Sequence, residues 1–236
     1  MSSLRARLSE LVALQALPEG SARQLRALLD VVETDPQAPT TIVDPVDGVE
    51  AHIADALDGL QVAAIRAAGR IADLGAGAGF PGLALAVALP TAHVSLLDSV
   101  GKKVAFMSRA AAAAGLENAF PIHARAEEWQ EGMEGQDVVT ARALAPLAVL
   151  VEYAAPLLVV GGRLVAWKGV RDPAEEADGE AAAATTGLEL AEVIDVAPRK
   201  GASHRHLYVY SKVRETPARY PRRAGMARKR PIQASS

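Results

Sequence analysis

The sequence contains no cysteine among its 236 residues. Disulfides, thiolate metal ligands and cysteine nucleophiles are therefore excluded. The five histidines do not fall into a metal-ligand pattern either. We expect no metal site.

Long apolar runs are also missing. No stretch approaches the 18 uncharged apolar residues of a membrane-spanning helix, so we expect no contact with a membrane. The N-terminal residues include Arg5, Arg7 and Glu10 and lack the apolar core of a signal peptide. We therefore expect a soluble, cytoplasmic protein. The length allows one large domain, or one domain with a helical extension. Half of the residues are hydrophobic, which is enough for a sizeable core.

The net charge of −3 hides an uneven distribution. Between Arg199 and Arg230 there are eleven Lys or Arg and one acid, Glu215, a net of +10. The rest of the chain has 14 basic and 27 acidic residues, a net of −13. A basic segment on an acidic body suggests a polyanionic partner. A tail that only aids solubility has the same composition.

The periodicity of apolar residues predicts helices first and then an alternation of strands and helices. Helices are expected at 4–17, 21–33 and 49–57, and later at 81–89, 102–114 and 146–159. Short apolar strands are expected at 70–74, 93–97, 119–124, 137–141 and 163–167, the last after a turn at Gly161-Gly162. Two late strands, 189–196 and 207–213, have a short connection that fits an antiparallel pair.

This alternation predicts an α/β fold, with a mostly parallel twisted sheet and helices on both faces. We divide the chain into an N-terminal helical extension (1–60), the α/β domain (61–213) and a basic tail (214–236). Prolines at 217, 221 and 231 suggest that the tail is extended and flexible. We expect it to add affinity for the polyanion and to be dispensable for binding a cofactor.

A glycine-rich turn follows the first strand. Gly75, Gly77 and Gly79 allow the backbone to turn tightly and to approach a ligand closely. Ligands of open α/β sheets bind beyond the carboxyl ends of the strands, where this turn lies. The string from Gly77 to Gly82 also satisfies the dinucleotide pattern G-x-G-x-x-G, so an NAD-linked oxidoreductase is one alternative.

Two acidic residues help to distinguish between the two cofactors. Asp73 precedes the turn and would place a carboxylate beside the pyrophosphate that a dinucleotide site must bind. S-adenosylmethionine has no phosphate, and its sulfonium and ammonium groups tolerate a carboxylate. Asp98 ends the second strand, 19 positions after Gly79, and could bind the ribose of either cofactor. Asp73 therefore favours a methyltransferase.

Further candidates lie at the ends of other strands. The string Ala126-Glu127-Glu128 could hold an adenine, or could be acids favoured by the dipole of a helix N-terminus. Arg142 could bind a cofactor carboxylate, an RNA phosphate or a guanine, or could form a structural ion pair. Lys168 has the same alternatives. His52 and Asp55 would share one helix face, an arrangement that is usually structural.

These strings together resemble the small-subunit (16S) ribosomal RNA guanine-N7 methyltransferases. The matching segments are 71–82, 96–103, 126–128, 142–143, 168–169 and 205–207, within a similarity that spans roughly 52–213. The glycine string combined with LLDSVGKK is more specific than either part. The string Tyr-Pro-Arg-Arg at 220–223 also looks like the tails of this family.

The resemblance implies a Rossmann-like methyltransferase that uses S-adenosylmethionine, with cofactor contacts from Gly75, Phe80, Ala126, Glu127 and Arg142. Together with the analysis above, it gives these candidate cofactor-binding residues: Asp73, Gly75, Gly77, Gly79, Phe80, Asp98, Ala126, Glu127 and Arg142. We expect Arg142 to position either substrate or cofactor. The family often carries Tyr-Asn-Leu-Thr ahead of the helix that contains His52, whereas residues 38–42 here read Ala-Pro-Thr-Thr-Ile. We carry over no RNA contact from that loop.

Nitrogen-7 of guanine has an in-plane lone pair and no proton, so it can attack the sulfonium methyl group without a general base. The enzyme would then act by alignment and by stabilising charge. The lack of cysteine argues against covalent methylation of a pyrimidine carbon, and the lack of an Asn-Pro-Pro-Tyr string argues against an exocyclic amino group. We expect a monomer that acts on small-subunit ribosomal RNA or a ribosomal particle. The alternatives are the oxidoreductase and a non-catalytic RNA-binding or ribosome assembly protein with a cofactor-binding fold.

Overall fold

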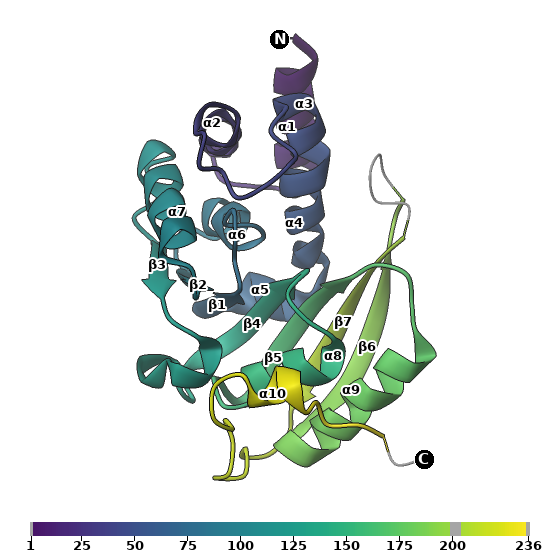
Figure 1. Ribbon diagram of the computed structural model, residues 1–236. Coiled ribbons are helices and arrows are strands. Elements are labelled where there is room, and N and C mark those ends of the chain that lie inside the picture. The colour runs from purple at the N-terminus through teal and green to yellow at the C-terminus, as the bar shows by residue number, and fades with distance from the viewer. Residues whose placement is uncertain (1, 199–203, 235–236) are drawn as a thin grey trace.

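A seven-stranded sheet forms the centre of the computed structural model, which describes residues 2–198 and 204–234 (Figure 1). The strand order is β3-β2-β1-β4-β5-β7-β6. β1 to β5 are parallel, and β7 runs antiparallel to both β5 and β6. The strands are β1 (Arg70–Leu74), β2 (His93–Asp98), β3 (Ala119–His123), β4 (Gln136–Arg142), β5 (Leu158–Lys168), β6 (Leu188–Val196) and β7 (Arg205–Lys212).

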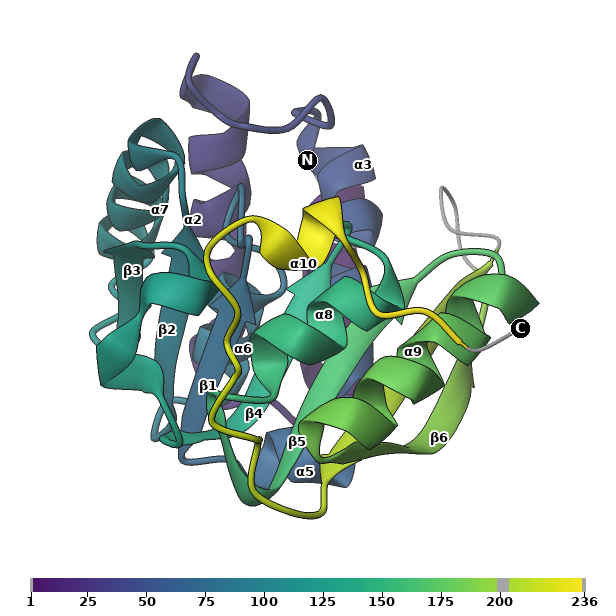
Figure 2. The ribbon, with the colours of Figure 1, turned by 60° about the horizontal axis from the view of Figure 1, so that its bottom comes forward.

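Helices cover both faces of this sheet (Figures 1 and 2). One face carries α1 (Ser2–Leu14), α2 (Ser21–Thr34), the short turns α3 (Pro45–Gly48), η1 (Val49–Ala54), α4 (Asp55–Leu57) and η2 (Asp58–Gln61), and then α5 (Ala63–Ala67), α6 (Gly82–Ala88) and α7 (Gly101–Ala113). The other face carries α8 (Leu147–Ala154), α9 (Pro173–Thr186) and α10 (Met226–Lys229), with the turns η3 (Ala126–Glu128) and η4 (Gln130–Gly132) after β3. The expected α/β fold with a mostly parallel sheet is confirmed.

The strands are apolar along their length because both faces of the sheet are buried. Successive side chains of a strand point to opposite faces. Ile71 accordingly packs in the core beneath the N-terminal helices, whereas Ala72 and Leu74 pack in the core beneath α8 and α9.

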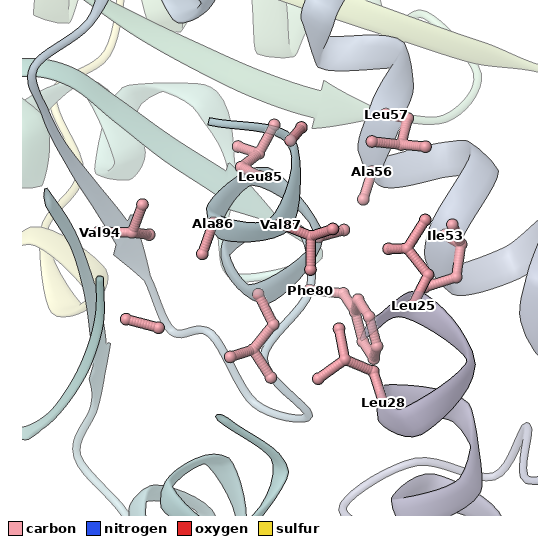
Figure 3. Close-up of a cluster of buried hydrophobic side chains, with 14 of the residues drawn as sticks. Leu25, Leu28, Ile53, Ala56, Leu57, Phe80, Leu85, Ala86, Val87 and Val94 are labelled. Atoms are coloured by element: carbon pink, nitrogen blue, oxygen red, sulfur yellow. The ribbon is translucent and has the colours of Figure 1, made fainter. Parts of the chain in front are cut away.

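The N-terminal helices share the first of these cores with the sheet. Leu25 and Leu28 of α2 lie against Ile53 of η1 and Phe80, near Val87 of α6 (Figure 3). Residues 1–60 therefore bury their apolar side chains against the α/β core. The division of the chain at residue 60 remains a prediction about domain organisation.

The boundaries around β5 differ from the sequence-based expectation. The helix expected to reach residue 159 ends at Ala154, and β5 begins at Leu158. The turn expected at Gly161-Gly162 lies inside β5, where the pairing with β4 shifts register. Gly161 has a φ of 94°, which glycine adopts at little cost, so the strand can continue through the irregularity. The late antiparallel pair is present as β6 and β7.

The basic tail is packed, contrary to the expectation that it would be free of the body. We call residues 214–234 the C-terminal strap; it passes along α8, forms α10 and continues towards α9 (Figure 2). Arg222 pairs with Glu152 of α8, and Ala227 is buried. The Ala234 amide donates to Asp178 of α9 at 2.8 Å. Basic composition does not distinguish an arginine in water from one that has a buried carboxylate partner. Arg199 and Lys200, counted with the basic segment, lie outside the described residues.

Candidate functional site

The glycine-rich turn lies directly beyond the carboxyl end of β1. Gly75, Gly77 and Gly79 have φ angles of 62°, 60° and 89°, a region that other residues rarely adopt. A Cβ at Gly75 would lie 2.4 Å from Leu144 Cδ1, and one at Gly79 would lie 2.2 Å from Leu83 Cδ1. Gly77 differs, because the nearest atom to its Cβ would be the Gly75 carbonyl oxygen at 3.7 Å. Close packing therefore requires glycine at 75 and 79, whereas position 77 has space beside it.

A cavity of about 430 Å³ opens next to this turn. Its volume is within the range of about 300–1,000 Å³ that is common for small-molecule sites. Four of the sequence-predicted residues line it: Gly75, Asp98, Ala126 and Glu127. The other lining residues were not predicted from the sequence to bind a cofactor; they are Leu74, Leu97, Ser99, Val100, Lys103, Ala124, Arg125, Ala143, Leu144, Tyr153 and Arg228.

Asp98 presents a buried carboxylate to the cavity at the end of β2. Its Oδ1 accepts the Val100 amide at 2.9 Å and its Oδ2 accepts the Gly77 amide at 3.1 Å. The Lys103 ammonium lies 3.6 Å from Oδ2. A carboxylate offers about four lone-pair positions, so Asp98 can still accept a hydroxyl of a ligand. This chemistry suits a ribose.

Glu127 lies across the cavity, in the turn η3 after β3. Its Oε1 accepts the amide of Gly225 in the C-terminal strap at 2.9 Å. The strap also reaches the opposite wall, where Arg228 Nη2 donates to the carbonyl oxygen of Leu144 at 2.9 Å. The strap is thus part of the cavity's surroundings.

Asp73 does not line the cavity and lies fully buried beneath the glycine turn. Its Oδ2 accepts the Gly82 amide and its Oδ1 accepts the Thr140 hydroxyl, both at 2.9 Å. Burial raises the pKa of Asp73 to about 6, although both hydrogen bonds act to lower it. Asp73 therefore ties β1 to the start of α6 and to β4. The geometry does not support the direct cofactor contact on which the choice of cofactor relied.

Phe80 is buried beside the cavity rather than in its lining. Its ring stacks on His52, with centroids 4.9 Å apart. His52 Nε2 lies 3.0 Å from the carbonyl oxygen of Ile42, and burial lowers the pKa of His52, which favours the neutral ring. Phe80 and His52 thus join the glycine turn to the N-terminal segment.

Arg142, at the end of β4, points towards the N-terminal helices and away from the cavity lining. Its Nη1 donates to Asp55 Oδ2 at 2.6 Å and to the carbonyl oxygen of Ala51 at 2.9 Å. Arg205 Nε donates to the other oxygen of Asp55, also at 2.6 Å. The indole N–H of Trp167 binds the Asp55 carbonyl. We call Asp55, Arg142 and Arg205 the arginine cluster. Asp55 is almost fully buried, and its arginines keep 15% and 23% of their side chains exposed.

Arg142 and Lys168 thus both form structural ion pairs, which was one of the alternatives expected for each. Lys168 pairs with Glu175 of α9 at 2.5 Å. Neither pair excludes a ligand, because a guanidinium has five N–H donors and an ammonium has three.

Within residues 2–198 and 204–234, no group of three or more Asp, Glu or His side chains is placed to hold a metal ion. Across the same residues, no helix has the length and apolarity to cross a membrane.

Comparison with known proteins identifies relatives. The family model described as rRNA small subunit methyltransferase G matches residues 38–208. A protein of Rubrobacter xylanophilus named ribosomal RNA small subunit methyltransferase G is 43% identical over 188 residues, covering 77% of this chain and 72% of that protein. One of Roseiflexus castenholzii with the same name is 45% identical over 168 residues, covering 69% and 70%.

Solved structures share the fold. One described as a predicted O-methyltransferase of Agrobacterium tumefaciens superposes with a TM-score of 0.52 and 28% identity, covering 64% of this chain and 76% of that one. A branched-chain polyamine synthase mutein of Thermus thermophilus, in complex with N4-aminopropylspermidine and 5′-methylthioadenosine, gives a TM-score of 0.60 at 18% identity, covering 83% and 65%. The second likeness concerns the fold alone.

The match of the family model over most of the chain gives no support to the NAD-linked oxidoreductase. It agrees with a cavity that presents a glycine turn and a buried carboxylate at neighbouring strand ends. The chain belongs to the rRNA small subunit methyltransferase G family and is a methyltransferase that uses S-adenosylmethionine.

Proposed function

We propose that this protein transfers a methyl group from S-adenosylmethionine to nitrogen-7 of a guanine in small-subunit (16S) ribosomal RNA. The observation that carries the proposal is the cavity at the carboxyl ends of the parallel strands, with Arg142 of the arginine cluster directly before Ala143 of its lining. The relatives named for ribosomal RNA supply the class of substrate.

The residues that line the cavity fit the cofactor. Asp98 would accept the ribose hydroxyls, and the open space beside Gly77 would take the methionine part. Ala126 and Glu127 would hold the adenine through backbone groups and a carboxylate. Gly77, Gly79 and Phe80 would act by shaping the turn rather than by side-chain contact. The bound cofactor supplies an electrophilic methyl group.

The arginine cluster would hold the RNA. Asp55 accepts a hydrogen bond from one N–H group of each guanidinium and fixes its direction, which leaves other N–H groups of Arg142 and Arg205 for a phosphate or for the O6 atom of guanine. Their role is positioning, because nitrogen-7 carries no proton and needs no general base. The protein would accelerate the reaction by aligning this nitrogen with the methyl group in a site shielded from water.

We further propose that the protein acts in the cytoplasm, as a monomer, on ribosomal RNA or a ribosomal particle. A non-catalytic role in ribosome assembly is the second candidate, and it is an outcome of the following experiment.

Methyl transfer from labelled S-adenosylmethionine would be measured on small-subunit RNA and on small-subunit particles, both from a strain that lacks the gene. Digestion to nucleosides should place the label in 7-methylguanosine, and RNA from the parent strain should accept little. Label in another nucleoside would refute the nitrogen-7 assignment. Binding of cofactor and RNA without transfer would favour the assembly role.

An Arg142→Lys variant tests the positioning role against an Arg66→Lys control. Arg66 binds the Leu60 carbonyl and Gln15, away from the cavity. We expect Arg142→Lys to lower methylation of RNA at least tenfold, because lysine cannot reproduce the forked geometry of a guanidinium. The control should stay within twofold of the wild type. Equal activities of the two variants would remove Arg142 from the substrate site.

A further inference from the structure

The C-terminal strap bridges two walls of the cavity that the sheet order separates. Glu127 follows β3 and Leu144 follows β4, and β2 and β1 lie between these strands. The strap binds the first wall through the Gly225 amide and the second through Arg228, each at 2.9 Å. Arg228 itself lines the cavity. A short segment from the end of the chain therefore spans the region where the cofactor would lie.

The strap is held in place by a buried anchor. Arg222 binds both oxygens of Glu152, whose side chain is only 3% exposed. The same guanidinium donates to the carbonyl oxygen of Arg230 at 2.9 Å, which joins the segments before and after α10. Ala227 packs into the core beneath α8. Leaving Glu152 buried without its arginine would be costly, so the docked strap is favoured.

The strap adds polar groups to one end of the cavity. Tyr153, next to Glu152 on α8, also lines the cavity. Arg228, Tyr153 and Glu127 thus bring hydrogen-bond donors and a carboxylate acceptor to the same end. An adenine base has ring nitrogens that accept hydrogen bonds and an exocyclic amino group that donates them. The three side chains complement this pattern.

We propose that the C-terminal strap is a wall of the cofactor pocket, in which Arg228 binds the adenine end of the cofactor and the Gly225 amide positions Glu127. The proposal rests on the cofactor site described above. It replaces the expectation that the tail is dispensable for cofactor binding, which assumed that every cofactor contact precedes position 143.

The test is calorimetric binding of S-adenosylhomocysteine to the full chain and to an Arg228→Ala variant. We expect affinity to fall about tenfold in the variant. Lys229→Ala is the matched control, since it removes the neighbouring charge from a residue outside the cavity lining, and it should stay within twofold of the wild type. Binding of 5′-methylthioadenosine should fall by a similar factor, because this fragment keeps the adenine end and lacks the amino-acid part.

A second variant tests the whole strap. Truncation after Thr216 would leave Glu152 buried and unpaired, so the truncated chain also carries Glu152→Gln. Circular dichroism and thermal unfolding would establish that it folds. The folded, truncated chain should bind both ligands at least tenfold more weakly than full-length Glu152→Gln. If it fails to fold, the Arg228→Ala measurement decides alone.

Affinities of Arg228→Ala and Lys229→Ala that both match the wild type would overturn the proposal. Unchanged affinity of the folded, truncated chain would do the same. A failure of the proposed function would look different. In that case the wild type itself would bind no S-adenosylhomocysteine or would transfer no methyl group to RNA.

Discussion

Replacement of Asp73 by Asn should change how the free energy of unfolding depends on pH. The carboxyl group is fully buried between β1, β4 and the start of α6, and burial raises its pKa to about 6 from an ordinary value of 3.8. Between these values the folded state binds more protons than the unfolded state. The stability of the wild type should therefore fall as pH rises through this window.

The magnitude follows from the two pKa values. Each pKa unit corresponds to about 1.4 kcal/mol, so ionising Asp73 in the fold costs about 3 kcal/mol. Asparagine cannot ionise and can keep both hydrogen bonds. Its carbonyl oxygen would accept the Gly82 amide, and its NH₂ group would donate to the Thr140 hydroxyl, which can also accept. At pH 4 the unfolded carboxyl is already about half ionised, so we expect the stability of Asp73→Asn, relative to the wild type, to rise by about 2 kcal/mol between pH 4 and pH 8.

Denaturant unfolding without cofactor, repeated at several pH values in that range, measures this difference. Asp30→Asn is the control, because the side chain of Asp30 in α2 is 48% exposed and pairs with Arg26. Its difference from the wild type should stay flat over the same range. A flat difference for Asp73→Asn as well would show that the fold does not disfavour the charged form of Asp73.

Three further variants test the packing around the site. Gly77→Val should abolish binding of S-adenosylhomocysteine and cost about 1–2 kcal/mol of stability through its φ of 60°; tight binding with a normal circular dichroism spectrum would place the site elsewhere. Asp55→Ala leaves the mostly buried Arg142 without its carboxylate and should lower the free energy of unfolding by about 3 kcal/mol in urea titrations. A loss below about 1 kcal/mol would contradict this role. Gly59→Ala would place a Cβ 2.6 Å from Trp167 Cζ2 and should cost about 1–3 kcal/mol, which a calorimetric melting scan would detect; an unchanged melting temperature would mean that the indole can shift.

The strand ends explain what the sequence could predict. In a parallel sheet the carboxyl ends of the strands meet at one edge, so residues directly after an apolar run fall near a common ligand. Gly75, Asp98, Ala126 and Glu127 were found in this way, and all four line the cavity. The same rule placed Arg142 near the correct edge. The rule did not give the direction of the Arg142 side chain, which depends on the buried Asp55, far away in the sequence.

Two features could not be predicted from the sequence because they depend on contacts between residues far apart in the chain. Arg222 and Glu152 are 70 positions apart, and no local pattern marks this pair within a basic segment. The position of Arg228 in the cavity follows from that contact and so was missed as well. For Asp73 a signal was present, because an acid between apolar residues of a strand covered on both faces must be buried. We interpreted its place before the glycine turn as exposure to the ligand.

Three consecutive residues at the end of β4 connect the two sides of the site. Arg142 binds Asp55 on the side of the N-terminal helices, Ala143 turns the chain with a φ of 53°, and the Leu144 carbonyl accepts Arg228 of the strap. Leu144 also packs against Gly75, so the same segment borders the glycine turn. The arginine cluster and the cofactor wall are therefore joined over a span of two peptide bonds. Methyl transfer depends on holding two reactants in line, and a connection this short limits how far either side can shift relative to the other.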